Sequence, residues 1–197
     1  DAAGAERAGI FAQPGVLASH SGPTDTRPIK RGVFWVRKAM CMELEAAPKN
    51  LHAEIYQIEG KSERQRIERS TRQSACFGCH KVINPFGFML ESYDALGRFR
   101  TADKGIPIDP AVDFNFLDEG PASAETTAAA LKTLTGSMMF KQCFVRQLFR
   151  FYAGRQEEAG DDPLLRRMFL EFAKDDAQDI VGALQTLASS NRMIRRQ

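Results

Sequence analysis

The stretch that decides how the rest of the chain is interpreted is "SACFGCHKVINPFGF", residues 74–88. It places Cys76 and Cys79 two residues apart, and His80 follows at once. Covalent haem attachment needs two thiols at this separation, one for each vinyl group of the porphyrin, and an adjacent imidazole that reaches the iron. We therefore predict one covalently bound haem c, with His80 as the proximal, metal-binding ligand of the iron.

Three other interpretations of the same residues remain open. A zinc site needs four ligands, usually from a second close pair, and the other candidates are scattered: Cys41, Cys143, His20 and His52. A thioredoxin-like redox pair needs a βαβ setting, whereas this chain has mostly helical patterns. The last alternative is two buried structural cysteines next to a surface histidine.

The composition narrows the class of protein. With 197 residues, the chain suffices for one compact domain or two small ones. Its net charge of +2 gives no case for nucleic acid or an anionic membrane, and no apolar run approaches a transmembrane segment. Because the sequence starts at Asp1 without an initiator methionine or signal peptide, we expect a processed product or a piece of a longer protein.

The hydrophobic pattern predicts a mainly α fold. Apolar residues at helical spacing predict a helix over 31–44, followed by an irregular connection over 45–60. Ser62 and Gln65 resemble a capping box that opens a helix over about 63–73, with the C-x-x-C-H stretch at its end. We expect a turn at Asn84-Pro85, then a short helix that Gly97 stops.

The rest of the chain divides into loops and helices. Residues 101–121 read as loop with a small hairpin. Helices are predicted in the last third, one ending at Gly154 and one starting at Asp162-Pro163. We expect an initial segment with a first helix (1–61), a haem-binding core (62–121) and a C-terminal helical region packing on it (122–197).

A longer stretch, "CFGCHKVINPFGFMLESYDALGRFRTADKGIPID" (76–109), resembles the C-terminal, cytochrome c-like domains of a family of exported proteins, domains of unknown function first noted in planctomycetes and also found in proteobacteria. The matching positions are Asn84-Pro85-Phe86-Gly87-Phe88, Glu91, Asp94, Gly97-Arg98-Phe99-Arg100 and Ile108-Asp109. Residues 7–41 and 143–162 are similar to the family's first and closing segments, although Arg27 replaces a usual serine.

The resemblance implies a cytochrome c-like haem domain with long irregular loops, followed by a small C-terminal helical subdomain. It also implies a redox role in the periplasm or another exported location. Cys41 and Cys143 resemble a recurring family pair, which would form a disulfide in an oxidising compartment; two free buried thiols are the alternative.

Supporting roles follow for three residues after the motif. In small cytochromes c, a proline shortly after the motif lets a backbone carbonyl accept the proximal imidazole N–H, and Pro85 stands at such a position here. Pro85 is also placed to end a helix. Arg98 and Arg100 are candidates for pairing with the haem propionates, or for structural pairs with Glu91 or Asp94.

The sixth iron ligand has several candidates. Met138 and Met139 stand 58 and 59 residues after His80, an interval typical of a distal methionine, just before a predicted helix. His20 stands where many members of the resembling family also have histidine, and a second histidine would give a lower potential than a methionine. An open or water-occupied site is the remaining possibility.

Three functions are consistent with these residues. The leading hypothesis is an electron-transfer cytochrome c domain that passes single electrons to a redox partner protein. The rival is a haem enzyme, peroxidase- or oxidase-like, with an open iron site. The third is a haem relay subunit of a larger complex. No catalytic triad, phosphate loop or paired acid and base was found, which favours a carrier over a catalyst.

Overall fold

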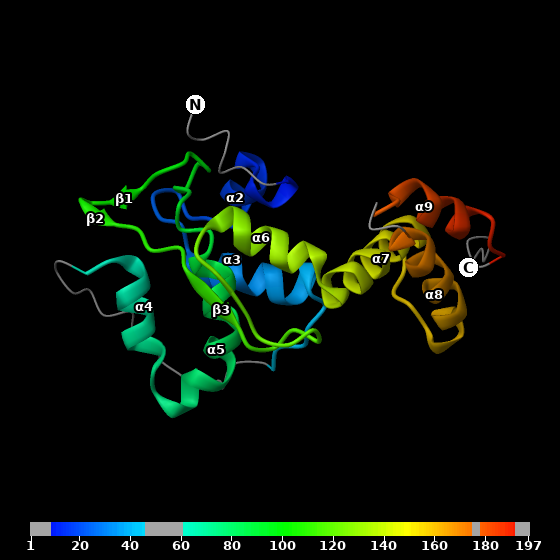
Figure 1. Cartoon of the computed structure of the whole chain (residues 1–197), viewed down its shortest axis with the longest axis horizontal. Helices are drawn as coiled ribbons and strands as arrows, with labels where there is room; N and C mark the ends of the chain where they lie inside the picture. Colours follow the sequence, from blue (N-terminus) through cyan, green and yellow to red (C-terminus); the bar gives the residue numbers. More distant parts are fainter. Residues whose placement is uncertain (1–8, 46–60, 175–177, 192–197) are drawn as a thin grey trace.

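A computed structural model describes residues 9–45, 61–174 and 178–191, and in them the protein is mainly helical, as predicted (Figure 1). Helices carry most of the described chain, and the strands are short. In chain order the elements are η1 (Ile10–Ala12), α2 (Pro14–Ser19), α3 (Pro28–Phe34), η2 (Trp35–Ala39), α4 (Glu63–Thr71), α5 (Ser74–Phe88), β1 (Ala102–Asp103), β2 (Ile106–Pro107), β3 (Val112–Phe114), β4 (Ala122–Ala124), α6 (Thr127–Gly136), α7 (Met138–Ala153), η3 (Ala159–Asp161), α8 (Asp162–Phe172) and α9 (Ile180–Ala188).

Local signals in the sequence set several helix ends correctly. The Ser62 hydroxyl accepts from the Gln65 backbone N–H, and the Gln65 side chain accepts from the Ser62 N–H, which confirms the capping box. Gly154 adopts the left-handed conformation at the end of α7, with φ 65°. The predicted irregular connection falls almost wholly outside the described residues.

The helix predicted over 31–44 is wrong at its end. The helical segment starts at Pro28, widens into the π-helical turn η2, and stops after Ala39. The Met40 N–H bonds the carbonyl of Trp35, and the chain then turns at Cys41, whose φ is 50°. This turn points Cys41 towards α7, where its disulfide partner lies.

The described residues form two antiparallel two-stranded ladders between the helices. In β1–β2, Ala102 pairs with Pro107, which confirms the expected small hairpin. In β3–β4, Val112 pairs with Ala124, and the two outer residues of β3 are buried. Strand β3 contacts α5, so it forms one wall beside the C-x-x-C-H helix.

In the described chain, helices α3 and α5 form the most extensive contact between two elements, and two glycines allow it. A Cβ at Gly32 would overlap the carbonyl oxygen of Ile83, and a Cβ at Gly87 would overlap the carbonyl oxygen of Pro28. The backbones can touch only because neither residue has a side chain. This contact fixes the middle and end of α5 against the core.

Buried apolar residues form two clusters, which α7 connects. The first contains Trp35, Phe86 and the start of α7 at Phe140. The second contains the end of α7 with α8 and α9. Phe144 packs against both, with ring centroids 6.0 Å from Phe140 and 5.0 Å from Phe172. Figure 1 shows α7 running out from the first half of the molecule to α8 and α9.

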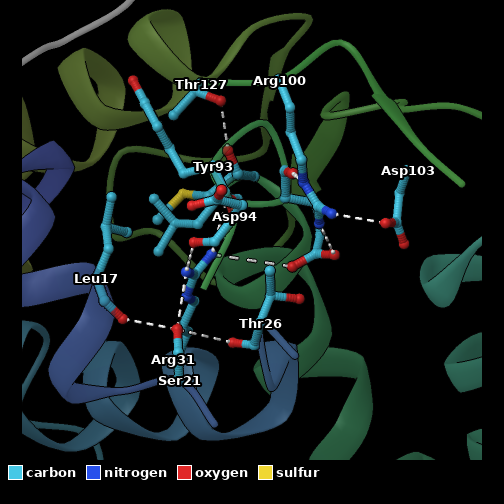
Figure 2. A network of polar contacts seen from close by, with 12 residues as sticks. Leu17, Ser21, Thr26, Arg31, Tyr93, Asp94, Arg100, Asp103 and Thr127 are labelled. Atoms are coloured by element: carbon cyan, nitrogen blue, oxygen red, sulfur yellow. Dashed lines mark hydrogen bonds and ion pairs between the residues drawn. The ribbon is translucent and has the colours of Figure 1, made fainter. Parts of the chain in front are cut away.

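Arg31 holds the turn that follows α5 (Figure 2). Its guanidinium is buried and donates to the backbone carbonyls of Leu90 (2.9 Å), Tyr93 (3.0 Å) and Asp94 (2.7 Å), and to the hydroxyl of Ser21 (2.9 Å). These carbonyls lie beyond the end of α5. Those of Leu90 and Asp94 also accept the backbone N–H groups of Tyr93 and Gly97, so Arg31 supplies a second donor at this turn. Arg31 therefore ties α3 to the segment that the family motif occupies.

Candidate functional site

The C-x-x-C-H stretch forms the first two turns of α5. Cys76 is half-buried and Cys79 exposed, and both thiols are free. His80 is half-buried in the second turn. A helix turns by roughly 100° per residue, so these three side chains leave one side of α5 within an arc of roughly 100°. The three groups that haem attachment requires are therefore accessible from one direction.

Three expectations about this region are wrong. The C-x-x-C-H stretch begins a helix of its own and does not end α4, Asn84-Pro85 lies inside α5, and α5 ends at Phe88, so no helix continues to Gly97. Proline in a helix removes one backbone hydrogen bond and costs about 3 kcal/mol. Here the helix also buries Phe86 and Phe88, each worth about 1.5–3 kcal/mol, and seats Gly87 against α3. The buried aromatic rings offset the loss.

A chain of hydrogen bonds fixes the imidazole of His80. The ring Nδ1 lies 3.0 Å from Oδ1 of Asn84, the Asn84 Nδ2 donates to the Thr71 hydroxyl at 3.1 Å, and this hydroxyl donates to the carbonyl of Ile67 at 2.8 Å. The hydroxyl proton is committed to Ile67, so Thr71 accepts from the Asn84 amide, which turns Oδ1 towards His80. His80 therefore carries its proton on Nδ1, and Nε2 keeps the lone pair that binds a metal.

Sequence reasoning placed this orienting bond elsewhere. The carbonyl of Pro85 accepts the N–H of Met89 at 3.1 Å, as an ordinary helical carbonyl does. Asn84, one turn after His80, takes the orienting position with its side chain. The signal was present in the sequence, since residues four apart face each other on a helix. Pro85 itself lines the cavity beside His80.

A cavity of about 810 Å³ lies between α4, α5 and β3. His80, Asn84 and Phe88 face it from α5, and Val112 closes the side formed by β3. Cofactor and small-molecule sites usually enclose about 300–1,000 Å³, so the space has the size of such a site. Cys76 and Cys79 are not among its lining residues.

Positive charge dominates the wall of this cavity. Its basic residues outnumber its acidic residues, Glu68 and Asp113; the basic ones are Lys61, Arg64, Arg69, Arg72 and Lys81. Arg64 holds α4 in place, because it bonds the carbonyls of Asp109 (3.0 Å) and Ala111 (2.6 Å). Arg69, Arg72 and Lys81 are exposed on this wall. A group with carboxylates would meet favourable charge there.

Arg98 and Arg100 form the structural pairs that the sequence also allowed. The Arg98 Nε lies 2.7 Å from Oδ2 of Asp94. Arg100 lies 3.4 Å from Glu91 and 2.8 Å from Asp103. Neither arginine lines the cavity beside His80. Their place in the family pattern is explained by the turn that they stabilise after α5, and their pairing with propionates stays a prediction without geometric support.

The three expected distal ligands lie away from this cavity. His20 ends α2 and stacks on Phe34, with ring centroids 4.0 Å apart. Figure 1 shows α2 at the top of the view and the start of α5 at its lower edge. Met138 begins α7, and Met139 packs on the first apolar cluster. Among the residues that the structure describes, the cavity is lined by a single histidine and no methionine. His52 falls outside these residues.

Cys41 and Cys143 form a disulfide, with their Cα atoms 5.3 Å apart, as the resemblance implied. The bond ties the turn after η2 to α7 across 102 residues of sequence. Beside it, the Gln147 side chain donates to the carbonyl of Lys38 at 3.0 Å. The first helical segment and the last third of the chain are thus joined covalently.

Within residues 9–45, 61–174 and 178–191, no group of three or more His, Cys, Asp or Glu side chains is arranged to hold a metal ion, so those residues give no support to a zinc site. In the same ranges, no helix has both the length and the apolar character that a bilayer crossing needs.

Comparison with known proteins identifies one family. Residues 7–103 match the family described as PSCyt3, a protein of unknown function (DUF1588). The match spans α2 to α5 and includes the C-x-x-C-H stretch and the turn built around Asp94. This part of the chain, just under half of it, is thus similar to a domain family whose function is not known. No curated protein and no solved structure matches the chain.

Proposed function

We propose that this protein carries one haem c, attached through Cys76 and Cys79 and ligated by His80, and that it transfers single electrons. The observation that carries the proposal is the bond between His80 Nδ1 and Asn84 Oδ1, which leaves Nε2 as the available ligand nitrogen. Histidines that bind metals commonly donate their other ring N–H to an oxygen in this way.

The residues present fit a haem. Both thiols are free, and one side of α5 presents them together with the imidazole. The adjoining cavity of about 810 Å³ supplies apolar contact through Phe77, Pro85 and Phe88. Arg72 and Lys81 are placed on its wall to pair with propionates, in preference to Arg98 and Arg100. A bound haem would supply one-electron chemistry at its iron.

The disulfide favours an exported location. A disulfide between Cys41 and Cys143 persists in oxidising compartments such as the periplasm and is rare in the cytosol. We infer that the protein works there with a redox partner protein, alone or within a larger complex. The partner would approach the side of α5 where Cys79 is exposed, because electrons pass through the haem edge nearest the surface.

The test is whether haem stays with the denatured polypeptide. The protein would be produced in a host with a c-type maturation system, denatured and extracted with acidified organic solvent, and a haemochrome spectrum taken. We expect retained haem with the spectrum of two thioether links. Cys76→Ser with Cys79→Ser should abolish retention, whereas Cys41→Ser with Cys143→Ser should not. A wild-type chain without covalent haem would refute the proposal.

One observation favours a second candidate, a haem enzyme with an open iron site. Met138, Met139 and His20 all lie away from the cavity that His80 lines. A carrier usually keeps both axial positions filled, whereas an enzyme leaves one for a small ligand. Adding carbon monoxide to the reduced protein and cyanide to the oxidised protein separates the two. Fast spectral changes at low ligand concentration favour the enzyme, and resistance favours the carrier.

A further inference from the structure

The hydrogen-bond chain from His80 does not end at Asn84. It crosses from α5 to α4 through the Thr71 hydroxyl and ends on the carbonyl of Ile67. We propose that Thr71 is a positioning residue that fixes the tautomer of His80 and thereby sets the reduction potential of the iron centre. The part concerning potential rests on the proposed function; the part concerning the tautomer does not.

Thr71 determines which atom of Asn84 faces the histidine. An amide can turn over and present either Oδ1 or Nδ2 with almost the same shape. The Thr71 hydroxyl donates its hydrogen bond to the carbonyl of Ile67, so towards Nδ2 of Asn84, 3.1 Å away, it can only accept. It therefore selects the orientation in which Oδ1 meets Nδ1 of His80 at 3.0 Å.

Without the hydroxyl, this selection is lost. The Asn84 amide is then free to present Nδ2 to His80, which favours the tautomer with its proton on Nε2. That tautomer lacks the lone pair needed at the ligand nitrogen. Even when the ring binds iron, a weaker acceptor at Nδ1 makes it a less basic ligand, so the oxidised, more positive iron is less stabilised. The reduction potential should rise.

Helix α4 is held firmly enough to act as the fixed end of this chain. Ile67 is buried in the first apolar cluster, with 1% of its surface exposed. Arg64, one turn earlier, bonds two backbone carbonyls before β3, and its guanidinium lies 5.2 Å from the centre of the Phe88 ring.

The first measurement uses haem-free protein. Long-range ¹H–¹⁵N spectra of the His80 ring report which nitrogen carries the proton. We expect Nδ1–H in the wild type and in Thr71→Ser, which keeps the hydroxyl, and a mixture or Nε2–H in Thr71→Val. Thr186→Val is the matched control, since its hydroxyl also bonds a carbonyl one turn earlier, at 2.9 Å, within α9. An unchanged tautomer in Thr71→Val would overturn the proposal.

The second measurement uses the haem-loaded protein. Thr71→Val should make reduction about tenfold more favourable, which is about 59 mV for one electron. Thr71→Ser and Thr186→Val should keep the wild-type potential. If haem is retained but Thr71→Val also keeps the wild-type reduction potential, the positioning role fails while the proposed function stands. If no haem is retained, the proposed function fails, and the haem-free spectra still decide the role of Thr71.

Discussion

The carboxylate of Glu91 lies 4.0 Å from the guanidinium of Arg31 in the interior of the first cluster, and both side chains are almost completely buried. Thr26 donates a hydrogen bond to this carboxylate, and Arg100 approaches it at 3.4 Å. Burial nevertheless outweighs these partners and raises the pKa of Glu91 from 4.5 to about 7. The Glu63 carboxylate acts in the same direction.

The first prediction concerns stability against pH. Because the folded state holds the Glu91 proton more tightly than the unfolded state, stability should fall as the pH rises from 4.5 to about 7. At 1.36 kcal/mol per pKa unit, the loss is on the order of 3 kcal/mol. Glu91→Gln should match the wild type at pH 5 and exceed it at pH 8 in urea unfolding. The exposed Glu171→Gln is the control; identical pH profiles for Glu91→Gln and the wild type would contradict this account.

The second prediction concerns the disulfide. Replacing Cys41 and Cys143 by serine should lower the free energy of unfolding by about 4–5 kcal/mol on the chain-entropy account, because the bond closes a loop of 102 residues. Urea unfolding of haem-free protein measures this. Cys76→Ser with Cys79→Ser removes as many thiols and leaves the disulfide, so it should unfold at nearly the wild-type concentration. Equal stability of the two double variants would rule out the disulfide's contribution.

The third prediction concerns the contact of α3 with α5. Gly87→Ala places a methyl group on the carbonyl of Pro28, and the overlap should cost about 1–3 kcal/mol. Gly136→Ala is matched in chemistry, but its added methyl meets nothing within 4 Å. That variant should be stabilised by about 0.4–1 kcal/mol. The melting temperatures of the two variants test this prediction. A destabilised Gly136→Ala together with an unaffected Gly87→Ala would contradict it.

The fourth prediction concerns the segment after α7. The Arg155 guanidinium donates two hydrogen bonds, of 2.6 and 2.9 Å, to the carboxylate of Asp161, which is fully buried. The same guanidinium lies 5.0 Å from the centre of the Phe149 ring. Arg155→Ala should lower the melting temperature and loosen α8, because a buried carboxylate loses its cation. Arg155→Lys should recover part of the loss. The exposed Arg166→Ala should have little effect, and equal melting temperatures for the two alanine variants would exclude this role.

Features that depend on residues close in the sequence could be predicted, whereas features that depend on tertiary packing could not. The capping box of Ser62 was readable because its partner lies three residues away. The bond of His80 to Asn84 was equally local, but proline at the next position suggested a turn and concealed it. Gly87 packs on α3 and Phe86 is buried, and this packing keeps the segment helical instead of forming the expected turn. No sequence pattern within α5 predicts that packing.

Thr71 lay beyond local reasoning. Its hydroxyl reaches Asn84 only because the short link at Arg72 and Gln73 brings the end of α4 alongside α5. The distal candidates failed in a related way. An interval of 58 residues fixes no distance in space, and Met138, at the start of α7, is not among the residues that line the cavity.

The disulfide also changes how the protein would respond to mechanical force. When the ends of the chain are pulled apart, tension passes from Cys41 to Cys143 through the sulfur atoms. Residues 42–142 form a closed ring off this load path, and the helix with the C-x-x-C-H stretch lies within it. The covalent chain through α4 and α5 therefore carries no tension when the segments outside the ring are drawn out.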